Sequence, residues 1–151
     1  MKVLLEKRGG RLYPADTTAE EALQGLPDGA VMAEITRPRN PAFHRKAFSM
    51  LRFAYDNWEP KQLPDYRGQA VSKSFERFRH DITILAGYGR PVVNMRGDVR
   101  IEPESLSYAS MSADTFEAWY SATIDALLRT VFSGQEKAEL EQRINEFMRF
   151  F

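Results

Sequence analysis

The chain carries, at residues 37–58, the run RPRNPAFHRKAFSMLRFAYDNW, which predicts a long helix with one buried face. Asn40 is a good N-cap, and Pro41 suits the first helical position because its missing N–H would be unpaired there. Apolar side chains then recur at helical spacing, at Phe43, Ala47, Met50, Leu51, Ala54 and Trp58. The helix is therefore predicted to be a rigid support for the charged residues around its beginning.

Positive charge is concentrated at the start of this helix. Residues 37–46 hold four of the 21 Lys and Arg residues and one of the two histidines. Arg37 and Arg39 precede the helix N-terminus, where free backbone N–H groups already favour an anion, and guanidinium groups suit phosphate oxygens. This region is therefore predicted to bind an anion or a partner. The alternative is a solvated face whose arginines pair with Glu34, Asp56 or the acidic C-terminal helices.

A second predicted helix, from about Ser72 to Ala86, extends the basic region. Basic residues interleaved with aromatic rings are typical of proteins that bind single-stranded nucleic acid. The spacing nonetheless favours a place in the core for Phe75 and Phe78 over stacking on bases. The residues predicted to hold nucleic acid are Arg37, Arg39, Arg45, Lys46, Arg52, Lys73, Arg77 and Arg79.

Charge is segregated along the chain, although the formal net charge is zero. Residues 1–36 carry four basic and six acidic side chains, residues 37–100 carry 13 and six, and residues 101–151 carry four and nine. Such asymmetry favours a basic face that meets an acidic partner. The alternative is that the basic middle pairs with the acidic ends inside the folded protein.

The remaining patterns predict one α+β domain over residues 1–151, with short antiparallel strands and about five helices. A capping box at Thr17 or Thr18 opens a short helix that ends near Leu26. The segment Glu59–Gln69, with two prolines, is predicted as a loop. The predicted strands are Lys2–Lys7, Arg11–Tyr13, Ala30–Thr36, the hairpin Val92–Met95 with Val99–Glu102, and Ser105–Ser110.

Two C-terminal helices are predicted to form a hairpin. Ser112 caps the first of them, and a capping box of Ser133 and Glu136 starts the last. The last helix is expected to bury Leu140, Ile144, Phe147 and Phe151. Aromatic side chains at such a terminus are expected to dock on the chain itself, and a homodimer through these helices is the alternative.

Composition and motifs argue against most catalytic classes. The chain has no cysteine, which excludes disulfides and thiolate chemistry and favours a reducing, cytoplasmic setting. No nucleophile elbow or phosphate loop is present, and His44 and His80 lie in no metal-binding motif. The N-terminal apolar run, Val3–Leu5, is too short for a secretory signal, and no membrane span is predicted. We expect no cofactor and no metal, and a non-enzymatic role is favoured.

Several motifs occur in an order that resembles a family of small phage and prophage proteins of unknown function. They are Arg39-Asn40-Pro-Ala-Phe43-His44-Arg45-Lys46-x-Phe48, Phe75-x-x-Phe78-Arg79-x-x-Ile82-Thr83-Ile84-x-Ala86-Gly87, Ile101-Glu102-Pro103-x-Ser105, Tyr120-Ser121 and Leu12-x-Pro14. The resemblance spans nearly the whole chain and implies a phage origin, hence a host-cell cytoplasm. It implies no established activity.

A second likeness covers about one helix. The Arg39-Asn40 pair ahead of Arg45-Lys46 and Phe48 is similar to NinB-type recombination mediators, which implies a role beside single-stranded DNA. The leading hypothesis is a non-enzymatic DNA-binding accessory protein with nucleic acid as its partner. The alternative is a protein that binds and modulates a host or phage complex, as anti-defence proteins do.

Overall fold

The computed structural model describes residues 1–149 and confirms the α+β class. Within these residues it has five helices and two antiparallel sheets of two strands each. The chain folds as two compact units, Met1–Ile35 and Thr36–Phe151, which are described separately. The single domain over residues 1–151 stays a prediction.

The first unit begins with a hairpin of β1 (Leu5–Arg8) and β2 (Arg11–Pro14). Gly9 and Gly10 connect the strands with φ values of 55° and 81°. Two consecutive positive φ values suit the tight turns that join hairpin strands, and glycine adopts them without steric cost. The predicted strand pair is thus confirmed, with the first strand shorter than expected.

A short helix, α1 (Thr17–Gln24), follows this hairpin. Its N-cap is Asp16, whose carboxylate accepts a hydrogen bond from the Ala19 N–H at 2.7 Å, so the predicted cap at Thr17 or Thr18 is wrong. The predicted strand Ala30–Thr36 is also wrong, because these residues are irregular and largely exposed. Their apolar alternation has no strand beside it with which to form a ladder.

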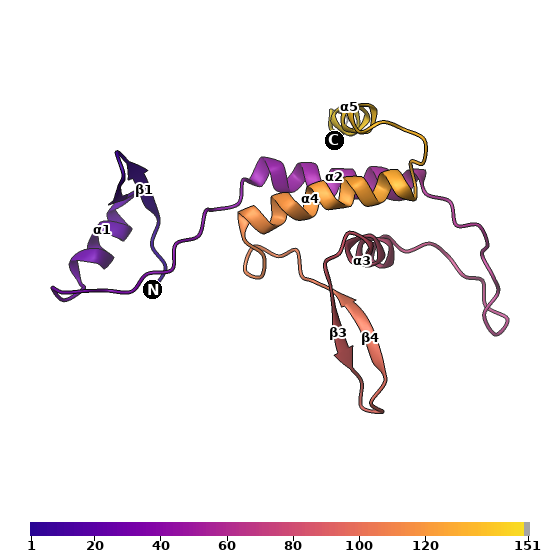
Figure 1. Ribbon diagram of the computed structural model, residues 1–151, viewed down its shortest axis with the longest axis horizontal. Coiled ribbons are helices and arrows are strands. Elements are labelled where there is room, and N and C mark those ends of the chain that lie inside the picture. Colours follow the sequence, from indigo (N-terminus) through magenta and orange to yellow (C-terminus); the bar gives the residue numbers. More distant parts are fainter. Residues whose placement is uncertain (150–151) are drawn as a thin grey trace. The chain divides into compact units, whose positions relative to one another are not determined.

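The second unit is built around two long helices. Figure 1 shows α2 and α4 running beside one another, with α3 and α5 seen nearly end-on on opposite sides of them. The buried core includes Met50, Leu51, Phe116, Trp119 and Ile124. The helices are α2 (Pro41–Asn57), α3 (Phe75–Leu85), α4 (Ala113–Arg129) and α5 (Lys137–Met148).

Helix starts in this unit largely follow the predicted capping chemistry. The Asn40 side chain accepts a hydrogen bond from the Ala42 N–H at 2.9 Å, with Pro41 in the first turn. Ser112 caps α4 as expected. The start of α5 differs, because its capping box consists of Glu136 and Glu139. Ser133 instead donates to carbonyl oxygens at the end of α4.

Helices α4 and α5 follow one another in the chain, and Figure 1 shows them crossing steeply. The hydroxyl of Tyr120 on α4 donates to the carboxylate of Glu141 on α5 at 3.0 Å. Leu140 and Ile144 are buried, as predicted, and the Phe147 ring lies 5.4 Å from that of Phe53. The predicted contribution of Phe151 lies outside the described residues.

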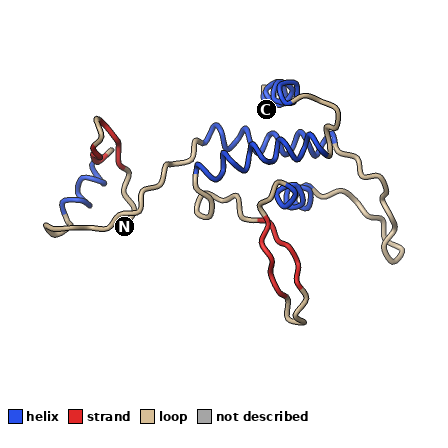
Figure 2. The backbone as a smooth tube through the Cα atoms, in the orientation of Figure 1, coloured by secondary structure: helices blue, strands red, loops and turns tan. Residues whose placement is uncertain are grey.

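A second hairpin joins α3 to the segment before α4. It consists of β3 (Gly89–Val93) and β4 (Val99–Pro103), with Arg90 opposite Glu102 and Val92 opposite Arg100. The predicted hairpin is confirmed, although β3 begins three residues earlier than expected. Figure 2 shows it extending away from the helices.

Candidate nucleic-acid interface

Arg39, a predicted phosphate ligand, is buried with only 7 % of its surface exposed. Its guanidinium group donates hydrogen bonds to the carbonyl oxygens of Leu106 at 2.6 Å, of Ser107 at 3.0 Å and of Met111. It also lies over two rings, 4.1 Å from the Phe116 centroid and 4.7 Å from that of Tyr108. Arg39 therefore holds the segment before α4 in place through its two terminal nitrogens, while its buried Nε has no hydrogen-bond partner among the described residues.

This clamp also explains why Ser105–Ser110 is a turn and not the predicted strand. A strand would direct alternate carbonyl groups to opposite sides. Here several carbonyls converge on a single guanidinium, whose planar array of donors can serve them together. The segment is thus ordered by a side chain from another part of the chain, Arg39.

His44 completes the cluster beside Arg39. Its ring is stacked on those of Phe48, Tyr108 and Phe116, with centroids 4.7, 4.6 and 5.4 Å away. Nδ1 lies 3.3 Å from Nη1 of Arg39, which can only donate, so Nδ1 accepts and the imidazole is neutral. Burial and, to a lesser degree, the Arg39 charge lower the pKa of His44.

This lowered pKa makes part of the stability depend on pH. Below about pH 6.5 His44 is protonated in the unfolded chain but stays neutral in the folded protein, because its folded-state pKa is lowered. The free energy of unfolding is therefore highest above about pH 6.5 and falls as the pH decreases toward the lowered pKa. Urea denaturation between about pH 7.5 and 5.5 should show this decline. His44→Phe, which keeps a ring in the stack, should flatten it. A decline of equal size in His44→Phe would contradict this assignment.

Lys73 likewise has a structural role. Its ammonium group donates to the carbonyl oxygens of Tyr55 at 3.1 Å and of the C-cap residue Trp58 at 2.6 Å, at the C-terminal end of α2. It also lies 4.6 Å from the centre of the Tyr55 ring and 3.6 Å from the Glu59 carboxylate. A cation at a helix C-terminus complements the helix dipole, so Lys73 secures the end of α2.

Four further members of the predicted set pair with carboxylates: Arg37 and Lys46 with those of the C-terminal helices, and Arg77 and Arg79 with those of their own helix. Arg37 contacts two on α4, Asp114 at 3.0 Å and Glu117 at 2.9 Å. An anion at the start of α2 would therefore have to displace two carboxylates. Lys46 lies 3.2 Å from Glu141 of α5. The basic middle and the acidic C-terminal helices thus pair in part, as one of the two predicted alternatives proposed.

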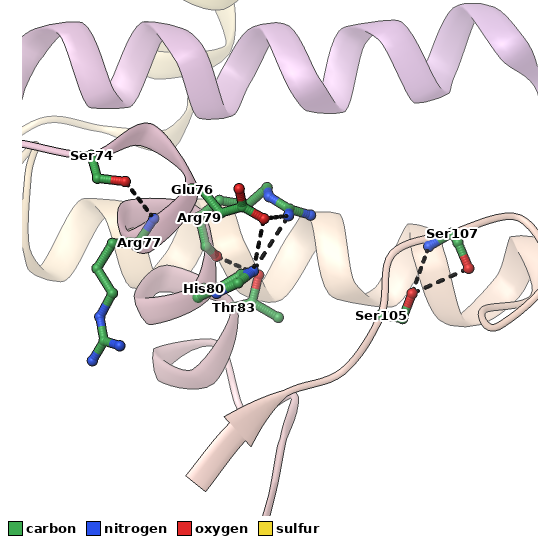
Figure 3. A network of polar contacts seen from close by, with 8 residues as sticks. All are labelled: Ser74, Glu76, Arg77, Arg79, His80, Thr83, Ser105 and Ser107. Atoms are coloured by element: carbon green, nitrogen blue, oxygen red, sulfur yellow. Dashed lines mark hydrogen bonds and ion pairs between the residues drawn. The ribbon is translucent and has the colours of Figure 1, made fainter.

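The basic residues of α3 pair within their own helix. Arg77 lies 3.2 Å from the Asp81 carboxylate, and Arg79 lies 3.2 Å from that of Glu76. Figure 3 shows Arg79 grouped with Glu76 and His80, while the Arg77 side chain extends in another direction. The cations of α3 therefore do not form a single row.

Arg45 and Arg52 are the members of the set that keep their charge free. Among residues 1–149, neither has a carboxylate within ion-pair distance, and both are exposed. They are seven residues apart on α2, which puts them on one face about 10 Å apart along the axis. The Arg52 guanidinium lies 4.1 Å from the centre of the half-buried Phe75 ring. On this face of α2, two arginines without a carboxylate partner therefore lie beside an aromatic ring.

Exposed cations outside the predicted set include two on the second hairpin. Arg90 and Arg96 lie on the β3–β4 hairpin and have no ion pair within the described residues. The sequence predicted that Arg96 lies in a turn. The structure adds that this turn is the exposed end of a projecting hairpin. Arg90 lies in β3 but ahead of the predicted strand Val92–Met95, so strand alternation was not applied to it.

Metal-binding groups and membrane-spanning helices are absent from the part of the chain that the structure describes. No three His, Asp or Glu side chains there gather closely enough to hold a metal ion. None of its helices combines the length and apolar character that crossing a bilayer requires.

Comparison with protein families gives a match over nearly the whole chain. The model of a protein family of unknown function, DUF1367, matches residues 2–63 and 61–150. No curated protein and no solved structure matches the chain. The predicted likeness to a family without an assigned activity is confirmed, while the phage origin and the NinB relationship stay predictions. The chain belongs to the DUF1367 family.

Proposed function

We propose that this protein is a non-enzymatic DNA-binding accessory protein that grips the phosphate backbone through the outer face of α2. The observation that carries the proposal is the pair Arg45 and Arg52, whose guanidinium groups have no carboxylate partner within residues 1–149. Unpaired arginines bind phosphate without first breaking an existing ion pair. The likeness of Arg39-Asn40 and Arg45-Lys46 to NinB-type mediators would place this activity in recombination.

Aromatic neighbours add a preference for single strands to the proposal. Arg52 and Phe75 form a cation–ring pair at the edge of the core, and Phe48 and Tyr55 are half-buried on the same side of α2. Rings at the border of a basic face supply stacking surface for unpaired bases. A duplex, with its bases stacked internally, would use the cations alone.

The test is a titration of labelled single- and double-stranded oligonucleotides by fluorescence anisotropy at about 50 and 200 mM salt. Each phosphate contact contributes close to one unit to the salt dependence of log K. Arg45→Gln/Arg52→Gln should therefore reduce this slope by about two units and weaken binding by about tenfold per arginine.

A matched control separates these two arginines from overall charge. Arg37→Gln/Arg77→Gln removes the same number of charges from residues that are exposed and already paired. It should leave affinity and salt slope close to those of the unmodified protein. Equal losses in both double variants, or no micromolar-range binding at low salt, would contradict the proposal.

The second candidate function is docking on a host or phage protein complex. It is favoured by carboxylates of the C-terminal helices that have no cation within ion-pair distance among residues 1–149, such as Asp125, Glu139 and Glu146. Exposed carboxylates of this kind attract a basic partner and can compete with nucleic acid for it. Partners captured from host lysate that persist after nuclease treatment would favour this function over DNA binding.

A further inference from the structure

The β3–β4 hairpin is a two-stranded sheet, and one of its two outer edges can accept a further strand. Within the hairpin and its continuation, Glu104 N–H donates to the Tyr88 carbonyl at 2.9 Å and Asn94 N–H to that of Asp98 at 3.0 Å. Even-numbered residues therefore face the neighbouring strand, and odd-numbered ones direct their N–H and C=O groups outward.

The two outer edges differ in their capacity to pair. On β3 the central outward residue is Pro91, which has no N–H and so blunts that edge. On β4 the outward residues Val99 and Ile101 both keep their N–H groups. An added strand would therefore bind to β4.

One face of the same hairpin is apolar and largely uncovered. Because side chains alternate, Pro91, Val93, Val99 and Ile101 share it. Near the helices Ile101 closes over Gly89, where an added Cβ would come within 2.6 Å of the Ile101 Cγ2 atom. Farther out, Val93 is 67 % exposed and Val99 70 % exposed. A projecting two-stranded sheet with such a face is marginal alone, and apolar surface of this kind marks an interaction site.

We propose that β4 pairs with β4 of a second copy of this chain, antiparallel across a two-fold axis at Ile101, to form a four-stranded sheet. In this register Ile101 exchanges both backbone hydrogen bonds with Ile101 of the second copy. The Val99 N–H donates to the carbonyl of Pro103 in the second copy, and because Pro103 has no N–H the Val99 carbonyl receives no bond in return. Each copy thus contributes its available edge donors.

Charge complementarity selects a second copy over an unrelated strand. Arg100 and Glu102 lie on the same face of β4, with Nε and Oε1 only 3.9 Å apart. In the proposed register Arg100 stands opposite Glu102 of the second copy, and Glu102 opposite Arg100. These are the non-hydrogen-bonded positions, where Cα atoms approach to about 4.5 Å and cross-strand pairs interact most closely. The strand is therefore complementary to itself.

The apolar face gains a partner in the same arrangement. Ile101 of the two copies meets at the axis, and Val99 lies opposite Pro103 of the second copy. The resulting contact is small, because each copy contributes a single short strand and its face. It belongs to the class of weak interfaces below about 1,200 Å², so a dimer of micromolar-range stability is expected.

The test is sedimentation velocity of the full chain without nucleic acid, from about 5 to 300 µM. The unmodified protein should show a monomer–dimer equilibrium in this range. Arg100→Glu and Glu102→Arg, each made alone, should weaken the dimer by tenfold or more, because like charges then face each other. The double variant Arg100→Glu/Glu102→Arg restores opposite charges in the same register and should recover the dimer.

Arg96→Glu is the matched control, since it makes the same charge change at the tip of the hairpin, beyond β4. It should dimerise like the unmodified protein. A monomer at every concentration would overturn the proposal. So would a dimer unaffected by the single reversals, as expected for pairing through the C-terminal helices, or a charge swap that fails to restore the dimer. Because no DNA is present, none of these outcomes depends on the proposed function.

Discussion

Arg39→Met is expected to lower the free energy of unfolding by about 3 kcal/mol. The substitution removes the guanidinium donors from the carbonyl groups of Leu106, Ser107 and Met111. A hydrogen bond to a charged group contributes about 1.5–3 kcal/mol, and a buried acceptor left unpaired costs about 1–3 kcal/mol. Methionine keeps the apolar contact with the Phe116 ring and avoids burying a charge, which offsets part of the loss. Urea or thermal denaturation measures the difference.

The matched control for this variant is Arg45→Met. It makes the same chemical change on the same segment, but at an exposed side chain with no polar partner among residues 1–149. Its effect should stay within about 0.5 kcal/mol, as is usual for surface positions. Equal stability of Arg39→Met and Arg45→Met would show that the segment before α4 does not depend on the buried arginine.

Phe116→Ala is expected to destabilise the protein by about 3–5 kcal/mol, the usual cost of truncating a fully buried phenylalanine. The Phe116 side chain has no exposed surface. Its ring lies 5.7 Å from that of Phe43 and 5.1 Å from that of Trp119, and Arg39 rests on its face. The truncation therefore opens a cavity where α2, α4 and the clamped segment meet. Denaturant titration is the suitable measurement.

Tyr108→Ala tests whether this cost reflects burial or merely the presence of a ring. Tyr108 also contacts Arg39 and His44, but it is 54 % exposed. Little cavity forms when an exposed ring is removed, so a loss of about 1 kcal/mol or less is expected. A larger loss of unfolding free energy for Tyr108→Ala than for Phe116→Ala would contradict the assignment of Phe116 to the buried core.

Much of the fold could be predicted from local chemistry. Asn40 and Pro41 mark the start of α2, and Ser112 that of α4, because capping depends on a few adjacent residues. The two hairpins follow from glycine-containing turns between short apolar runs. The predicted strand Ala30–Thr36 was wrong because no second strand lies beside it, and Ser105–Ser110 because its carbonyl groups are bound by Arg39. Alternation indicates that a segment can form a strand but supplies no second strand to pair with.

The candidate site was less accessible to sequence reasoning. Arg39 and Arg45 lie in the same basic run, yet one is buried against carbonyl groups that are 67 or more positions away and the other faces solvent. Lys73 is likewise committed to the end of α2. Such partners depend on long-range packing, and a count of charges along the chain carries no information about them.

The most direct test of the account is to measure stability and DNA affinity together for Arg39→Met and for Arg45→Gln/Arg52→Gln. The first variant should lose about 3 kcal/mol of stability and, below its unfolding temperature, keep most of its DNA affinity. The second should unfold like the unmodified protein but bind DNA about a hundredfold more weakly. Unchanged DNA affinity in Arg45→Gln/Arg52→Gln would contradict the division of this basic run into a buried clamp and an exposed binding face.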